Sequence, residues 1–131
     1  MSDSDIQTLD LARARERMVQ VQIARRGIRD SSVLDSMRCV PREAFVDPGF
    51  EEFAYEDGPL PISEGQTISQ PYIVALMIEA AELRPSDRVL EIGAGSGYAA
   101  AVMGQIANRV YAIERYPSLG EAARRRFSSL G

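Results

Sequence analysis

Three glycines and two acids have the residue types and the spacing that could bind a small ligand. Gly93, Gly95 and Gly97 directly follow the apolar run 89–92 in the segment VLEIGAGSGYAAAV. Glycines are needed where a turn is tight and a ligand approaches the backbone closely, and the free amides at the start of the next helix favour a polar or anionic group. Glu114 ends the next apolar run about twenty residues later, where an acid commonly accepts hydrogen bonds from ribose hydroxyls. This pattern predicts a nucleotide or nucleoside site.

The glycines fit two registers, which indicate different cofactors. Gly95, Gly97 and Ala100 satisfy the dinucleotide form G-x-G-x-x-A, which would make the chain a NAD-binding half-domain. The other register, E-x-G-x-G-x-G, begins at Glu91 and also explains Gly93. The Glu91 carboxylate would repel a pyrophosphate but attract a cofactor that carries an ammonium and a sulfonium. The second register is typical of methyltransferases that use S-adenosylmethionine.

The composition excludes several other kinds of site. The chain has no histidine and one cysteine, Cys39, and all 15 of its basic residues are arginine. Histidine-based nucleophile systems, zinc clusters, Schiff-base lysines and the P-loop lysine are therefore absent, and no metal site is expected. A net charge of −4 argues against nucleic acid as a partner, and the arginines, including the run 124–126, are interpreted as solvated surface.

The elements that would position these residues form an α/β pattern. A long helix over about 5–26 should end at Gly27, and Asp30 should cap a short helix. The long helix has an imperfect apolar stripe of Leu9, Ala12, Met18, Val21 and Ala24 or Arg25. The prolines and glycines of 47–65 predict a long loop. Later helices are expected over 69–83, 98–107 and 118–130, with buried parallel strands at 88–92 and 109–113.

The chain as a whole resembles the protein-L-isoaspartate O-methyltransferases. The matching segments are MVQVQIARRGIRDSSVLDSMRCVPREAFV, AYEDGPLPISEGQTISQPYIVALM, DRVLEIGAGSGYAAAV and VYAIE, of which GQTISQP is the most specific. The resemblance implies a Rossmann-like S-adenosylmethionine-dependent methyltransferase fold, here incomplete. It implies an N-terminal helical cap with a substrate-side loop over 1–68 and the first half of the cofactor-binding fold over 69–131.

The implied activity is methyl transfer from S-adenosylmethionine to the free carboxylate of L-isoaspartyl residues in damaged proteins. By this resemblance Ser69 is the active-site residue. The alternative is that its hydroxyl serves only to cap the following helix. A carboxyl group with a pKa near 4 is already ionised at neutral pH, so this reaction needs no histidine as a general base. Together with the turn residues above, the expected cofactor-binding positions are Gln66, Thr67, Ile68, Ser69, Glu91, Gly93, Gly95, Ser96, Gly97, Glu114 and Arg115.

Chains of this family continue beyond the point that corresponds to Gly131. We therefore expect the chain alone to be weakly active or inactive, and a non-catalytic interaction domain remains an alternative. The single cysteine and the lack of an apolar run long enough for a membrane span predict a cytoplasmic protein without a membrane partner. The expected partners are isoaspartyl-containing peptides and proteins. The strand at 88–92 would also have one unpaired edge, which predicts a homodimer formed through it.

Overall fold

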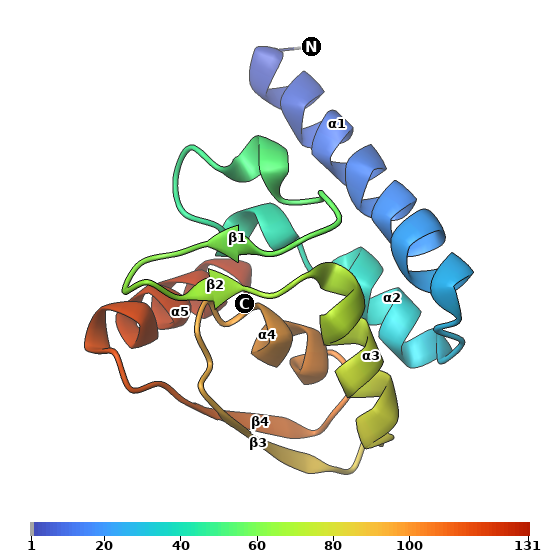
Figure 1. Ribbon diagram of the computed structural model, residues 1–131, viewed down its shortest axis with the longest axis vertical. Coiled ribbons are helices and arrows are strands. Elements are labelled where there is room, and N and C mark those ends of the chain that lie inside the picture. Colours follow the sequence, from blue (N-terminus) through green and yellow to red (C-terminus); the bar gives the residue numbers. More distant parts are fainter. Residues whose placement is uncertain (1) are drawn as a thin grey trace.

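The computed structural model describes residues 2–131, and Figure 1 shows how its elements are arranged. The helices lie to one side of a small parallel sheet, while a short antiparallel ribbon lies close to the C-terminal helix. None of the helices in this described range is long and apolar enough to cross a membrane. The elements are α1 (Asp3–Arg17), η1 (Met18–Ile23), η2 (Ala24–Arg26), α2 (Ser31–Cys39), η3 (Arg42–Phe45), η4 (Glu51–Phe53), β1 (Leu60–Pro61), β2 (Thr67–Ile68), α3 (Pro71–Ala81), β3 (Arg88–Ile92), α4 (Tyr98–Gly104), β4 (Arg109–Ile113) and α5 (Pro117–Leu130).

The first predicted helix changes its winding along its length. It is α-helical in α1, becomes a π-helix in η1 and ends as the 3-10 helix η2. Met18, Val19 and Ile23 are buried, whereas Leu9 and Val21, expected in the apolar stripe, are exposed. The predicted stripe is therefore confirmed at Met18 and wrong at Leu9 and Val21. Leu9 lies in α1, which buries none of its residues, and Val21 lies in η1, where hydrogen bonds five residues apart turn a different set of side chains toward the core.

The short connections that follow are largely as the sequence predicts. Gly27 ends the helical segment with a φ of 111°. The Asp30 side chain accepts a hydrogen bond from the Ser32 amide at 2.8 Å and so caps α2. The expected loop over 47–65 contains η4 and the two-residue strand β1, which pairs antiparallel with β2 in register Leu60↔Ile68. This ribbon was not predicted, because two-residue strands carry no periodicity.

The two predicted strands are confirmed with their bounds. β3 and β4 are parallel, with Val89 opposite Val110 and Glu91 opposite Ala112. Val89 and Val110 pack against the hydrophobic core, so this face of the sheet is the one that the helices cover. The parallel pairing places the glycine turn after β3 and Glu114 after β4 at the same edge of the sheet.

The prediction that both strands are buried was wrong for the other face. Leu90, Ile92, Tyr111 and Ile113 are 58%, 78%, 50% and 54% exposed. In Figure 1 no helix of the described chain lies on this side of β3 and β4. The apolar composition of the strands is typical of a parallel sheet covered on both faces, while this chain covers only one.

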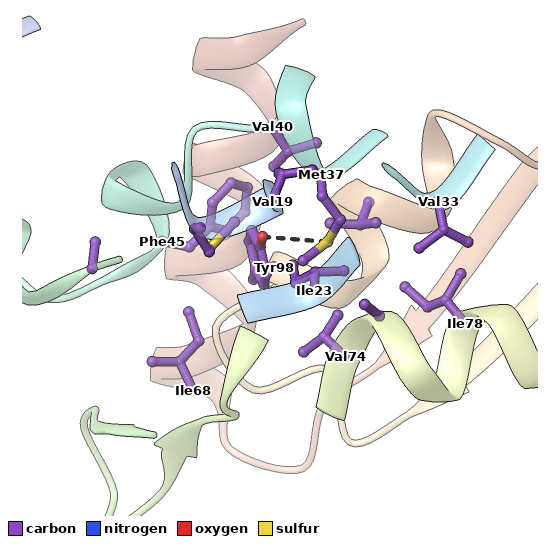
Figure 2. Packing of buried hydrophobic residues seen from close by; sticks show 14 of the residues in the cluster. Val19, Ile23, Val33, Met37, Val40, Phe45, Ile68, Val74, Ile78 and Tyr98 are labelled. Atoms are coloured by element: carbon purple, nitrogen blue, oxygen red, sulfur yellow. Dashed lines mark hydrogen bonds between the residues drawn. The ribbon is translucent and has the colours of Figure 1, made fainter. Parts of the chain in front are cut away.

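The hydrophobic core connects the N-terminal helices with the elements that follow residue 68. Figure 2 shows Tyr98, the first residue of α4, packed among side chains of the N-terminal helices. Its ring lies edge-on to Phe45, with centroids 5.7 Å apart, and its hydroxyl lies 3.6 Å from the Met37 sulfur. The helix that follows the glycine turn is thereby fixed to the N-terminal half.

Candidate functional site

The glycine turn needs glycine for two separate reasons. Gly95 has a φ of 56° and Gly97 a φ of 90°, a left-handed conformation that most residues avoid. A Cβ on Gly97 would also lie 2.9 Å from the Phe127 ring and 3.1 Å from the Ala123 Cβ. Gly97 therefore lets α5 pack directly against the start of α4.

Glu114 is hydrogen-bonded to the backbone of the turn. Its two carboxylate oxygens accept hydrogen bonds from the amides of Tyr116 and Gly95, each at 2.8 Å. These amides, Tyr116 first, hold the pKa of Glu114 below its usual range. No ion pair joins Glu114 to Arg115 among residues 2–131, and the Arg115 guanidinium instead lies 5.4 Å from the centre of the Tyr116 ring. Each Glu114 oxygen keeps a second lone pair that can accept from a ligand hydroxyl.

The segment 66–69 lies against the glycine turn. A Cβ added to Gly95 would lie 4.0 Å from the Thr67 carbonyl oxygen, so the Thr67 backbone borders the space beside Gly95. Gln66 and Thr67 are exposed, while the Ile68 side chain is buried in the core. Only the backbone of Ile68 can therefore face a ligand.

Ser69 does not cap the helix that follows it. The N-cap of α3 is Gln70, whose side chain makes no cap hydrogen bond. Its side-chain Nε2 instead donates to Asp57 Oδ1 at 2.7 Å. Ser69 itself is exposed, and its hydroxyl makes no hydrogen bond within the part of the chain that the structure describes. The interpretation of Ser69 as a helix cap was therefore wrong, because the cap position lies one residue later.

Glu91 and Ser69 line the same cavity. This cavity has a volume of ≈ 450 Å³, lies between α3 and β3, and is otherwise mostly apolar. The Glu91 Oε1 atom is buried without a hydrogen-bond partner among residues 2–131. Burial raises the pKa of the Glu91 carboxyl to about 7. The cavity thus holds a carboxyl group that can accept a proton or a cationic group.

The Ser96 side chain is used within the protein. Ser96 is buried, and its hydroxyl accepts a hydrogen bond from the Tyr98 amide at 3.2 Å. Its carbonyl accepts from Arg126 Nη1 at 2.9 Å, and the same guanidinium pairs with Asp47 at 3.7 Å. The interpretation of Arg126 as solvated surface was wrong. The sequence could not predict this contact, because nothing in a run of three arginines indicates that the third one reaches the glycine turn.

Comparisons with known proteins give the family of this chain. A family model described as protein-L-isoaspartate(D-aspartate) O-methyltransferase matches residues 13–131. A protein-L-isoaspartate O-methyltransferase from Methylorubrum extorquens is 66% identical over 122 residues, which are 93% of this chain and 54% of that protein. Another from Pelobacter propionicus is 64% identical over 117 residues, or 89% of this chain and 52% of that protein. The chain spans about half the length of the curated relatives it matches.

Solved structures give the same family and fold. A protein-L-isoaspartate O-methyltransferase structure superimposes with a TM-score of 0.80 at 32% identity, covering 89% of this chain and 39% of that one. A structure from Plasmodium falciparum has a TM-score of 0.75 at 27% identity, covering 88% of this chain and 55% of that one. It is described as a candidate protein-L-isoaspartate O-methyltransferase in complex with S-adenosyl-L-homocysteine. The chain therefore has part of a Rossmann-like methyltransferase fold and belongs to the protein-L-isoaspartate(D-aspartate) O-methyltransferase family.

Proposed function

We propose that this chain carries the N-terminal part of a site that transfers a methyl group from S-adenosylmethionine to the free carboxylate of L-isoaspartyl residues in proteins. The observation that supports this most directly is the position of the Thr67 carbonyl, which borders the space beside Gly95 and so places the family-specific segment next to the glycine turn. An exposed Ser69 hydroxyl follows in the same segment. The family match supports the reaction type.

The residues present fit such a cofactor. The buried, unpartnered oxygen of Glu91 suits a cationic group, and the remaining lone pairs of Glu114 suit ribose hydroxyls. When bound, S-adenosylmethionine supplies an electrophilic methyl group on a sulfonium. The cofactor-binding residues that we propose are Gln66, Thr67, Ile68, Ser69, Glu91, Gly93, Gly95, Ser96, Gly97, Glu114 and Arg115.

In this proposal the protein aligns the substrate and does not activate it. The Ser69 hydroxyl donates a hydrogen bond to the isoaspartyl carboxylate and fixes its orientation. The carboxylate is already ionised at neutral pH, so the chain needs no general base, in keeping with its lack of histidine. The apolar lining beside Ser69 keeps water from the carboxylate.

A NAD-binding function is less well supported by the site. The Glu91 carboxyl is already poorly solvated, and a pyrophosphate close to it would raise the cost of its negative charge further. The dinucleotide register also leaves Gly93, with its φ of 84°, unexplained. A non-catalytic interaction domain would keep the scaffold but need neither the exposed Ser69 nor the unpartnered Glu91 oxygen.

Three further proposals concern the protein as a whole. Residues 1–68 form the helical cap with the substrate-side loop, and 69–131 form the first half of the cofactor-binding fold. The protein acts in the cytoplasm, where its one cysteine, Cys39, which is free and exposed, would stay reduced.

The chain also associates with a second copy through the open side of β3 and β4, where the exposed apolar face adjoins an unpaired strand edge.

A chimera tests the proposed reaction. In the chimera, the part of this chain that matches the Methylorubrum extorquens relative over 122 residues replaces the corresponding part of that relative. The relative supplies the remainder of the fold. We expect the chimera to methylate an isoaspartyl peptide but not the same peptide with normal aspartate, and Ser69→Ala to abolish turnover. A folded chimera that binds S-adenosylhomocysteine and methylates neither peptide would contradict the proposal, as would full activity in Ser69→Ala.

A further inference from the structure

Arg42 is a fully buried arginine that contacts both halves of the candidate site. It lies in η3 with no exposed surface. Its Nε donates to the Ala54 carbonyl at 2.6 Å, and its Nη2 donates to the Ser69 carbonyl at 2.8 Å. The guanidinium carbon lies 4.9 Å from the centre of the Tyr98 ring.

These three contacts reach three separate segments of the fold. Ala54 belongs to the loop before β1, and Ser69 lies between β2 and α3. Tyr98 is the first residue of α4, directly after Gly97 of the glycine turn. One rigid side chain therefore spans the distance between the Ser69 segment and the turn.

The burial of the Arg42 side chain is energetically unfavourable. No carboxylate pairs with it among residues 2–131, and its Nη1 atom is buried without a partner. Burial accordingly lowers the pKa of Arg42. Burying an unpaired charge is unfavourable, and an apolar side chain of similar volume often gives equal or greater stability. Stability alone does not account for an arginine at this position.

We infer that Arg42 is a positioning residue, which fixes the Ser69 backbone relative to the glycine turn so that one ligand can contact both. This inference rests on the proposed function, in which the cofactor lies between these segments. The planar guanidinium suits the task because it directs two donors at fixed angles and stacks on an aromatic ring. Lysine keeps the charge but has neither the fork nor the flat face.

The experiment compares Arg42→Lys with Arg13→Lys, which changes an exposed arginine without a hydrogen bond in the described chain. Near-UV circular dichroism first establishes that each variant is folded. Calorimetric titration of the 131-residue chain with S-adenosylhomocysteine then gives the dissociation constant, and NMR gives the ¹³C shift of the Ser69 carbonyl. We expect Arg42→Lys to move the Ser69 shift and to weaken binding about tenfold, because the Ser69 segment is then less well preorganised for the ligand. Arg13→Lys should change neither.

The possible failures are distinguishable. If the wild-type chain does not bind S-adenosylhomocysteine, the proposed function fails and this inference fails with it. If the wild type binds and Arg42→Lys binds equally well, only the positioning role is wrong. If Arg42→Lys does not fold, the wild type still decides. The resonance of the Arg42 Nη2–H that donates to Ser69 should shift during the titration and saturate with the ligand, and an unmoved resonance would overturn the inference.

Discussion

Glu114 illustrates how one side chain can shape a binding turn and still face a ligand. Both of its oxygens hold backbone amides, those of Gly95 and Tyr116, at 2.8 Å. The carboxylate therefore fixes the turn before any ligand arrives. A preorganised acceptor of this kind loses less entropy on binding than a free side chain.

Glu114→Ala should weaken S-adenosylhomocysteine binding by ~1.5–3 kcal/mol, the range for a hydrogen bond to a charged group. It should also lower the free energy of unfolding by about 1–3 kcal/mol, because two amides lose their acceptor. Calorimetric titration and urea unfolding measure the two effects. Glu121→Ala, which removes an exposed acid from α5, is the matched control. An unchanged dissociation constant in Glu114→Ala would remove Glu114 from the ribose site.

Glu91 should make the stability of the ligand-free chain depend on pH. Its pKa is raised from 4.5 to about 7, so the folded state keeps a proton that the unfolded state releases. The contribution of this proton to the free energy of unfolding is fully present below pH 4.5 and is lost as the pH rises to about 7. Glu91→Gln should therefore be more stable than the wild type near neutral pH and above, by about 1–2 kcal/mol once solvent screening is allowed for.

Urea unfolding of the wild type and Glu91→Gln at a series of pH values measures this difference. The two proteins should converge in acid and diverge as the pH rises. Parallel stability curves would show that the Glu91 carboxyl titrates normally in the folded chain.

The sequence was informative for acids beside strand ends and uninformative for buried arginines. The position of Glu114 beside the glycine turn could be predicted because the carboxyl ends of parallel strands converge on one edge of the sheet. Arg42 and Arg126 could not, because each acts through contacts with residues far away in the sequence. The burial of an arginine has no local pattern, since its charge alone predicts a solvated residue.

At the scale of elements, the position of α5 depends on the glycine turn. Phe127 and Ala123 of α5 occupy the space that a side chain at position 97 would need. The sequence predicted the bounds of β3 and β4 correctly, since short apolar runs ended by turn residues are a strong signal. It predicted the burial of Met18 but failed at Val21, because nothing local predicts where an α-helix changes to a π-helix.

Gly97→Ala should lower the free energy of unfolding by about 2–4 kcal/mol, combining a left-handed backbone with overpacking against α5. Gly104→Ala is the matched control, because Gly104 ends the same helix and a Cβ there meets no atom within 4 Å. That change should leave stability unaltered or raise it by up to about 1 kcal/mol. Chemical denaturation compares the two, and equal stabilities would mean that α5 does not pack as closely as described.

At the scale of the whole molecule, one face of the sheet is left bare. The exposed side chains of Leu90, Ile92, Tyr111 and Ile113 form a continuous apolar surface beside the unpaired edge of β3. The N-terminal helices do not cover this surface, since they lie on the opposite side of the sheet. The sequence predicted apolar strands here but could not show which face the chain itself covers.

We expect the chain to form a dimer through this surface, because burying exposed apolar side chains and pairing a strand edge are both favourable. Light scattering coupled to gel filtration at several concentrations measures the mass. Ile92→Lys should shift the equilibrium to monomer, while Leu9→Lys, a similar change on the exposed face of α1, should not. A wild-type chain that stays monomeric at every concentration would contradict the dimer.

The central claim is that this chain holds part of a binding site for S-adenosylmethionine. Calorimetric titration of the 131-residue chain with S-adenosylhomocysteine, and separately with NAD, tests it most directly. We predict saturable one-to-one binding of S-adenosylhomocysteine and no heat of binding with NAD. Binding of NAD alone would favour the dinucleotide register that begins at Gly95, and binding of neither ligand would contradict the claim.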